Sequence, residues 1–375
     1  MIKFVVLTKS IMQLKEIIQF LEEKAPSSLQ ESYDNSGLIC GHPSMEIKGA
    51  IICLDSTEDV IDEAIRHGYN LVIAHHPIVF SGLKKINGKN YIERTIIKAI
   101  KNDIAIYAIH TNLDNVIHGV NAKIAEKIGL INCRILSPMK NKLLKLSTYV
   151  PHEHAEKVKE ALFNAGAGHI GNYSECSFST TGEGTFKGGD SSNPVYGEKN
   201  VRFKGHESKI EVILESHKQH QVFKALQEAH PYEEVAYEFI ALANNWQEVG
   251  AGMIGDLPSE MDTAEFLKSL KTKMKTDCIR HTNMVNKSIK KVAVCGGAGS
   301  FLLEEAKRAG ADIFITGDFK YHQFFDADGS IIIADIGHYE SEQYTIELLG
   351  DWLSEKFPTF ALRLTEINTN PINYI

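Results

Sequence analysis

The sequence predicts an α/β protein in which two related halves, each with a mostly parallel sheet, form one host domain that is interrupted by an inserted α+β domain. Strands alternate with helices in residues 1–142, the same order returns in residues 246–375, and residues 143–245 carry a different pattern. Such alternation is typical of parallel sheets covered by helices. The length of 375 residues also fits two or three domains of roughly 150 residues each.

The first half is predicted to begin with an amphipathic helix over residues 11–25, where apolar residues recur at helical spacing. Residues 31–41 are expected to form a turn and loop. Helix-end signals identify a helix over residues 57–67, with Ser56 or Thr57 as its cap and Gly68 as its stop. The other predicted elements are strands at 50–54, 71–74 and 104–109 and a helix at 120–128.

The second half repeats this order of strand, helix, glycine, strand, polar motif, strand and polar motif. Its predicted strands cover 291–295, 312–316 and 331–334, and its predicted helices cover 301–308 and 340–357. Any two strand–helix–strand units look alike to some degree. We favour a true internal repeat, because turn and polar positions coincide as well as apolar ones.

The segment between the halves reads as strand–helix–strand twice, which is the ferredoxin-like split βαβ pattern. Its expected elements are strands at 146–150, about 174–181, 209–215 and 235–242, helices at 152–164 and 220–229, and a loop at 182–200. Asn141 and Asn244–Asn245 mark the expected crossing points. The predicted boundaries are therefore 1–142 and 246–375 for the two halves of the host domain and 143–245 for the insert.

Composition excludes several classes of protein. The net charge of −8 gives a nucleic-acid partner no general electrostatic help. No apolar stretch approaches the ~20 residues of a membrane span, and the apolar run at residues 1–6 is too short for a signal peptide. The six cysteines form no CxxC pair, and several lie in apolar runs, as expected of buried free thiols in a reducing compartment. We therefore expect a cytoplasmic protein.

Four polar motifs follow the carboxyl ends of predicted parallel strands. They are Ala74-His75-His76-Pro77, His110-Thr111-Asn112-Leu113-Asp114, Gly317-Asp318 with Tyr321-His322, and Gly337-His338-Tyr339-Glu340-Ser341-Glu342. Open α/β sheets bind their ligands at this edge. The shared position of the motifs predicts one site.

Histidine with carboxylates suits a divalent transition metal. His338 and Glu342 are four residues apart and share one helix face. His75 and His76 diverge if the chain is extended, which favours two ions, each taking one histidine. Asp114 and Glu342 are the carboxylates expected to bind and bridge ions ~4 Å apart, an arrangement suited to hydrolysis. His110 and His322 are expected to orient ligands, or to serve as the acid or base.

Each motif also has a plainer interpretation. A lone histidine after a strand is more often a hydrogen-bonded loop residue, and the metal interpretation depends on the four motifs together. Asp318 could be a ligand, but Gly-Asp after a strand is more often a turn or cap. The loop at 296–300 could hold a phosphate, although a tight packing turn is favoured over that. The histidine pairs at 152/154 and 217/220 lack carboxylate partners and are expected to face solvent.

With these motifs assembled, the chain resembles the Ngg-interacting-factor-like family of dinuclear metal proteins, also named GTP cyclohydrolase I type 2 homologs. The matching stretches span the host domain and are ESYDNSGLICG, AHHPIVF, IHTNLD, ITGDFKYH and IGHYESEQ. The resemblance implies metal ligands at His75, His76, Asp114, His338 and Glu342. It also implies a PII/CutA-like insert and a toroidal homohexamer whose metal sites line an interior cavity.

The expected function is therefore that of a metal-dependent hydrolase with two divalent ions per chain, acting on a nucleotide or another phosphorylated substrate. Zinc is expected first, and manganese, iron and nickel also fit nitrogen and oxygen ligands. The resemblance makes a GTP cyclohydrolase reaction one candidate. The alternative is a metal-binding regulator or partner protein without turnover, and a PII/CutA-like insert would favour that.

Overall fold

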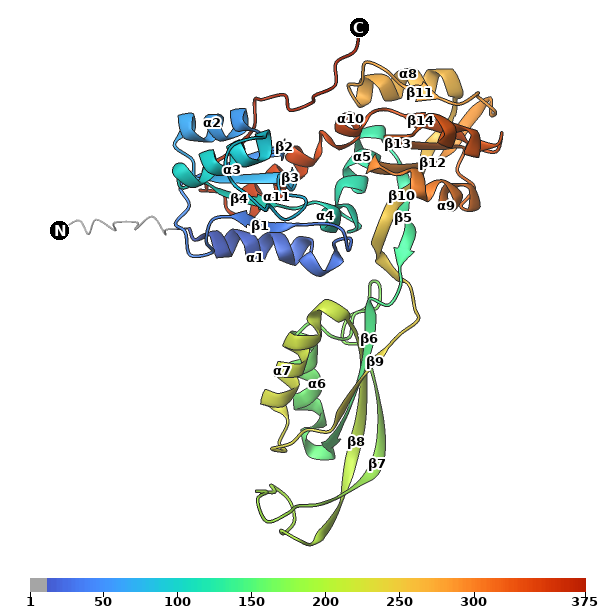
Figure 1. Cartoon of the computed structure of the whole chain (residues 1–375). Coiled ribbons are helices and arrows are strands. Elements are labelled where there is room, and N and C mark those ends of the chain that lie inside the picture. The colour runs from blue at the N-terminus through green and yellow to red at the C-terminus, as the bar shows by residue number, and fades with distance from the viewer. Residues whose placement is uncertain (1–11) are drawn as a thin grey trace, which may run out of the picture. The chain divides into compact units, whose positions relative to one another are not determined.

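The computed structural model describes residues 12–375 (Figure 1). The apolar run at residues 1–6 and the first residue of the predicted helix 11–25 lie outside this range. The chain divides into two compact units, one of which joins the residues up to Pro138 with Gln247–Ile375, while the other is Met139–Trp246. The division falls a few residues from the predicted boundaries at 142/143 and 245/246. No helix in the described part of the chain is long and apolar enough to cross a membrane.

The first sheet of the larger unit has the strand order β1-β4-β3-β2-β15. Neighbouring pairs among β2, β3 and β4 are parallel, as are β15 and β2, whereas β1 is antiparallel to β4. The strands are β1 (Gly37–Cys40), β2 (Ala50–Asp55), β3 (Leu71–His76), β4 (Ala105–Ala108) and β15 (Leu362–Leu364). The helical segments of this half are α1 (Leu14–Lys24), η1 (Ser27–Leu29), α2 (Glu58–His67), α3 (Tyr91–Lys101), α4 (Thr111–Asp114) and α5 (Val120–Ile128).

The end signals of α2 act as expected. The Thr57 side chain accepts a hydrogen bond from the Val60 backbone N–H, which satisfies one of the free donors of the first turn. Gly68 ends the helix with a φ of 67°, a left-handed conformation that glycine adopts without steric cost.

The second sheet has the order β11-β14-β13-β12-β10-β5. The pairs β12–β13 and β13–β14 are parallel, and β10–β12 and β11–β14 are antiparallel. The strands are β5 (Ile131–Met139), β10 (Trp246–Asp262), β11 (Arg280–His281), β12 (Ser288–Ala298), β13 (Ile313–Gly317) and β14 (Ile332–Asp335). The helical segments are α8 (Thr263–Lys273), η4 (Ser300–Leu302), α9 (Leu303–Arg308), η5 (Tyr321–Ala327), α10 (His338–Glu342) and α11 (Thr345–Lys356).

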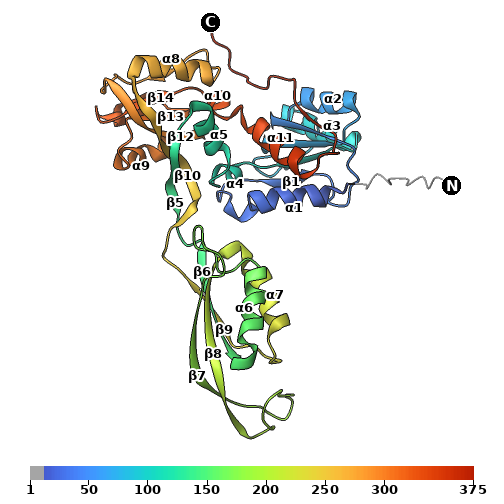
Figure 2. The ribbon, with the colours of Figure 1, turned by 180° about the vertical axis from the view of Figure 1, so that it is seen from behind.

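The two halves share the strand order β1-β4-β3-β2 and β11-β14-β13-β12, but they exchange a helix. Helix α5 follows the first sheet and packs on β12 of the second, whereas α11 follows the second sheet and packs on β2 and β15 of the first (Figure 2). Glycines allow the close approach: a Cβ atom on Gly296 would lie 2.9 Å from Val120 Cγ1 of α5. On Gly350 of α11 it would lie 2.9 Å from Leu364 Cδ2 of β15.

Two predicted elements need correction. The helix predicted over 340–357 is two helices, α10 and α11, because Gln343 and Tyr344 turn the chain by donating hydrogen bonds to the Met274 and Lys273 carbonyls. The loop predicted over 182–200 is shorter, since β7 continues to Lys187 in a ladder with β8. This hairpin is mostly exposed, so no apolar alternation marks it in the sequence. Strand β1 lies within the predicted loop 31–41. The elements that were not predicted are α3, α4, α8, β5, β10, β11 and β15.

The smaller unit has its own core. Its chain order is β6 (Leu143–Pro151), η2 (His152–His154), α6 (Ala155–Asn164), β7 (Ser177–Lys187), β8 (Arg202–Glu215), η3 (Ser216–Lys218), α7 (Gln219–Ala229) and β9 (Tyr237–Ala241). The sheet order is β7-β8-β6-β9, with every neighbouring pair antiparallel. Apolar residues of both helices pack against β6 and β8, including Val158, Leu162, Val222 and Leu226.

Candidate metal centre

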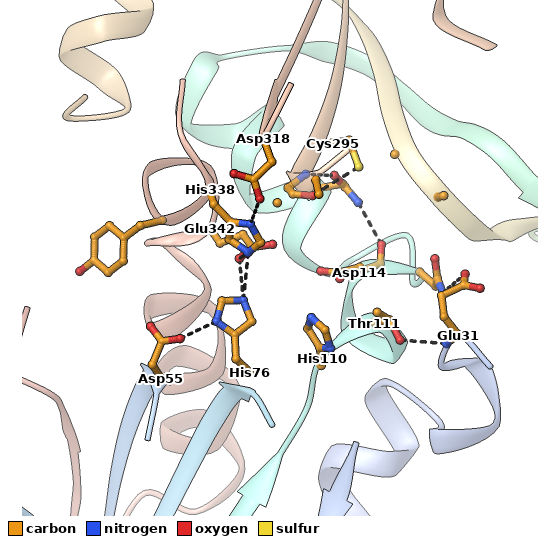
Figure 3. Close-up of a pocket in the computed structure, with 18 of the residues that line it drawn as sticks. Glu31, Asp55, His76, His110, Thr111, Asp114, Cys295, Asp318, His338 and Glu342 are labelled. Atoms are coloured by element: carbon orange, nitrogen blue, oxygen red, sulfur yellow. Dashed lines mark hydrogen bonds and ion pairs between the residues drawn. The ribbon is translucent and has the colours of Figure 1, made fainter. Parts of the chain in front are cut away.

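One pocket of about 570 Å³ collects side chains from the carboxyl ends of strands in both sheets of the larger unit (Figure 3). His76 ends β3, His110 and Asp114 follow β4, and His338 and Glu342 lie on α10 after β14. Residues that end or follow strands of both sheets thus meet at this pocket, and the carboxyl ends of strands are where open α/β sheets bind ligands.

His75 is fully buried, and its ring is fixed by one hydrogen bond. Nδ1 donates to the Ile109 carbonyl at 2.8 Å, which leaves the lone pair of Nε2 facing the pocket. Nε2 lies 3.6 Å from Asp114 Oδ1 and 3.8 Å from Glu342 Oε1. His75 Nε2 and Asp114 Oδ1 have no hydrogen-bond partner. Ligand atoms about 2 Å from one zinc ion stand about 3.5 Å apart in a tetrahedron, so this trio fits a divalent ion.

A second group of ligand atoms surrounds the other oxygen of the same carboxylate. Glu342 Oε2 lies 2.9 Å from His76 Nε2 and 3.1 Å from His338 Nε2. The two imidazole Nε2 atoms are 3.4 Å apart. Glu342 thus presents Oε1 to one group and Oε2 to the other, and of the two groups that contain Glu342, one includes His75 and the other His76.

Carboxylates behind the histidines fix their orientation. His76 Nδ1 donates to Asp55 Oδ1 at 2.8 Å, and His338 Nδ1 donates to Asp318 Oδ2 at 2.7 Å (Figure 3). Thr369, near the C-terminus, donates its hydroxyl to the other oxygen of Asp55 at 2.7 Å. Such partners hold a ligating ring in place and turn its Nε2 atom toward the position of an ion. Asp318 therefore orients His338, a role that the sequence analysis did not weigh.

His110 is held in a comparable way by Asp34. Its Nδ1 donates to Asp34 Oδ1 at 2.8 Å, and that carboxylate also accepts hydrogen bonds from Thr111 and Ser36. The His110 ring lies 5.3 Å from the rings of both His75 and His76. The structure thus brings His110 to the cluster, where it forms a third possible ligand group with these two histidines.

His322 is not brought to the cluster. The chain turns at Asp318, which has a φ of 58°, and His322 lies beyond the turn in η5. Its ring is exposed and contacts Tyr321 and Phe325 instead of lining the pocket. Within the chain His322 therefore does not line this pocket, and its role as an acid, a base or an orienting partner stays a prediction.

The glycine loop after β12 leaves room for the shared carboxylate. A Cβ atom on Gly297 would lie 2.5 Å from Glu342 Oε1, and the φ of Gly297 is +61°. Three N–H groups of the loop are occupied within the chain: Gly296 donates to Asn121, Gly297 to Ser341 and Gly299 to Thr316. The loop thus packs as a tight turn, which the sequence analysis favoured over a phosphate site.

The electrostatics of the metal-free cluster retain protons. Burial alone would lower the pKa of His76, but the Glu342 carboxylate and the hydrogen bond to Asp55 raise it to about 10. The same balance, with Asp318 as partner, raises the pKa of His338 to about 11. Burial and the charge of Glu342 raise the pKa of Asp114 to about 7. The pKa of Glu342 is held well below its usual range, against the effect of burial, by His338 and His76.

These pKa values predict that metal binding releases protons. At pH 7 both His76 and His338 carry the proton that an ion must displace from Nε2. The apparent affinity should therefore rise with pH from 6 to 9, by up to about a hundredfold per pH unit for an ion that displaces two protons. Calorimetric titration with zinc in buffers of different ionisation enthalpy measures the protons released. A binding constant that does not change with pH would contradict the protonated cluster.

The fold and the site together define a mixed α/β protein with grouped histidines and carboxylates that could hold a metal. The chain belongs to the Duf34/NIF3 (NGG1p interacting factor 3) family, whose model matches residues 12–371. Two similar proteins, each named GTP cyclohydrolase 1 type 2 homolog, come from Halalkalibacterium halodurans and Bacillus subtilis. They are 40% and 39% identical to this chain, and each alignment covers 96% of the chain and 98% of the relative.

Solved structures agree with this assignment. A Bacillus cereus protein related to NIF3 superposes with a TM-score of 0.85 at 38% identity, covering 97% of this chain and 100% of the other. A Staphylococcus aureus protein superposes with a TM-score of 0.77 at 30% identity, covering 97% and 99%. The resemblance drawn from the motifs is thereby confirmed at the level of the family.

Proposed function

We propose that the chain is a metal-dependent hydrolase whose pocket holds two divalent ions. The observation that carries this proposal is the position of Glu342, whose two oxygens face two separate groups of ligand atoms. The buried, unpartnered atoms His75 Nε2 and Asp114 Oδ1 support it further. A buried polar atom without a partner costs about 1–3 kcal/mol, a cost that an ion at this position would remove.

In this proposal His75, Asp114 and Glu342 hold one ion, and His76, His338 and Glu342 hold the other. When bound, the ions lower the pKa of water and polarise the group under attack. Asp55 and Asp318 keep the two outer histidines in the tautomer that presents Nε2. Glu342 fixes the spacing of the two groups, because both of its oxygens belong to one rigid carboxylate.

His110 is the proposed general base and acid. Its Nδ1 proton is committed to Asp34, and burial of that pair favours a fixed ring orientation. The hydrogen bonds from His110 and Thr111 lower the pKa of Asp34 despite its burial, so this carboxylate stays charged. A charged partner stabilises the imidazolium that forms when Nε2 takes a proton from the attacking water.

The substitution His110→Gln tests this assignment. It should lower turnover about 100- to 10,000-fold while both ions remain bound, since proton transfer of this kind contributes rate and not metal affinity. The assay is formate release from GTP and guanosine by zinc-loaded protein, with metal content from elemental analysis. His322→Gln is the matched control, because that histidine is exposed and lies outside the pocket. Two bound ions with no turnover of either compound would favour the regulator over the hydrolase.

The proposal also covers the identity of the metal, the cellular location, the type of insert and the oligomeric state. Zinc is the proposed metal, since nitrogen and oxygen ligands in threes suit it, with manganese, iron and nickel as alternatives. A cytoplasmic location is supported by six free cysteines. The β-α-β-β-α-β order of Met139–Trp246 supports a ferredoxin-like, PII/CutA-like insert. A homohexamer is proposed from the family resemblance alone.

A further inference from the structure

The C-terminal segment, residues 365–375, follows β15 and runs from the first sheet toward the second (Figure 1). It contains no helix or strand, yet its side chains make defined contacts. Asn370, Pro371 and Ile372 line the pocket of the metal centre. The segment therefore forms part of the pocket wall, and the contacts that hold it also reach the ligand residues.

Two consecutive residues of this segment contact the two halves of the larger unit. Thr369 Oγ1 donates to Asp55 Oδ2 at 2.7 Å, and Asp55 ends β2 of the first sheet. Asn370 Nδ2 donates to Glu340 Oε1 at 3.0 Å, and Glu340 lies on α10, which follows the second sheet. Because neighbouring Cα atoms are about 3.8 Å apart, these two contacts tie the end of β2 to α10.

The contact with Asp55 fixes a carboxylate that would otherwise be able to turn. Asp55 Oδ1 accepts a hydrogen bond from His76 Nδ1 at 2.8 Å, and Oδ2 accepts the one from Thr369. The terminal torsion of an aspartate is soft, so a second partner restricts its rotation. Thr369 thereby holds the plane of Asp55 and, through it, the ring of His76.

The contact with Glu340 holds the helix that carries the other ligands. Glu340 is 5% exposed, and its Oε2 atom has no hydrogen-bond partner. The bond from Asn370 to Oε1 therefore stabilises a buried carboxylate, a group that is costly to leave without partners. Without this bond, α10 would be less firmly placed, and both His338 and Glu342 lie on α10.

The ligand group around Glu342 Oε2 depends on both contacts. His76 and His338 come from different halves of the unit, and their Nε2 atoms lie 3.4 Å apart. The other group depends less on Asp55, because the ring of His75 is oriented by the Ile109 carbonyl instead. A change at Thr369 should therefore act on one ion and not on the other.

We propose that Thr369 and Asn370 are positioning residues of the metal centre, through which the C-terminal segment holds ligands from the two halves at the spacing that an ion needs. This rests on the proposed two-ion function. Thr369 acts on the ion of the His76 group through Asp55. Asn370 acts on both ions through α10, since both groups share Glu342.

Zinc occupancy of the whole chain, measured over free zinc concentrations set by chelator buffers, tests the role of Thr369. Thr369→Val keeps the size of the side chain but removes the donor, so it should weaken one ion about tenfold and leave the other unchanged. Thr369→Ser keeps a hydroxyl and should restore the affinity. Thr365→Val is the matched control, because Thr365 lies in the same segment and donates to Glu63, a carboxylate outside the pocket.

The same measurement tests Asn370. Asn370→Ala should weaken both ions, whereas Glu340→Gln keeps an oxygen that can accept from Asn370 and should keep both. Hydrogen exchange gives a readout other than affinity, since a contact that favours ion binding is favoured by the ion to the same extent. Zinc should therefore slow amide exchange over residues 366–372 in the wild type, and less so in Thr369→Val.

Two ions bound with wild-type affinity in both Thr369→Val and Asn370→Ala would overturn the proposal. Equal weakening of both ions by Thr369→Val would overturn the assignment of that residue to one ion. Fewer than two ions in the wild type would instead refute the two-ion centre itself, so failure of the proposed function is distinguishable from failure of the positioning role.

Discussion

Glu342→Gln should empty both halves of the metal centre. The wild-type chain is expected to hold two ions and this variant close to none, because one carboxylate supplies Oε1 to the His75 group and Oε2 to the His76 group. His338→Ala should behave differently and lose only one ion, since its imidazole Nε2 lies in one group alone. Elemental analysis after dialysis against a metal-free buffer gives the two stoichiometries.

Thermal unfolding provides a second measurement of the same effect. A ligand that binds only the folded state adds about 2.7 kcal/mol at a free concentration of 100 times Kd. Zinc should therefore raise the melting temperature of the wild type and leave that of Glu342→Gln unchanged. Glu340→Gln is the control, because Glu340 is a buried carboxylate on the same helix that hydrogen-bonds Asn370. Equal zinc content in Glu342→Gln and the wild type would refute the shared-carboxylate arrangement.

Gly297→Ala should weaken metal binding about a hundredfold although it replaces no ligand residue. Its added Cβ would lie 2.5 Å from Glu342 Oε1 and 3.2 Å from His338 Cε1, so the shared carboxylate must move. The substitution also places alanine at a φ of +61°, a left-handed conformation that costs about 1–2 kcal/mol. Chelator competition measures the affinity, and urea unfolding measures the loss of stability.

Gly310→Ala separates the two causes. Gly310 has a φ of +73° with no atom within 4 Å of an added Cβ, so this variant has the backbone cost without the collision. It should lose similar stability and keep wild-type zinc affinity. Equal zinc affinity in Gly297→Ala and Gly310→Ala would contradict the idea that Gly297 is needed to leave space for the Glu342 carboxylate.

The strand ends could be predicted from the sequence because buried parallel strands are continuous apolar runs, and the polar residues after them stand out. This held for β3 with its two histidines and for β4 followed by His110 and Asp114. The same rule applied to β2 would have found Asp55, which ends that strand and orients His76. Asp34 was visible within a quoted motif, but its pairing with His110 depends on chain packing that no local pattern reports.

Other features depend on tertiary contacts and could not be predicted. The break between α10 and α11 is set by hydrogen bonds from Gln343 and Tyr344 to residues about 70 positions earlier, while the local pattern continues as one helix. His322 follows a strand end, as the residues that line the pocket do. The positive φ of Asp318 sends the chain away from the pocket before His322 is reached. Position after a strand therefore selects candidates, and the turn that follows decides among them.

The exchanged helices have a consequence for synthesis on the ribosome. Strand β2 emerges early, yet α11, whose Gly350 approaches Ile52, is made near the end of the chain. The apolar face of β2 that α11 covers therefore stays exposed while the insert and the second sheet are translated. Contacts of such long sequence separation slow folding and leave surfaces open to aggregation. We expect the nascent chain to depend on chaperones until α11 is released from the exit tunnel.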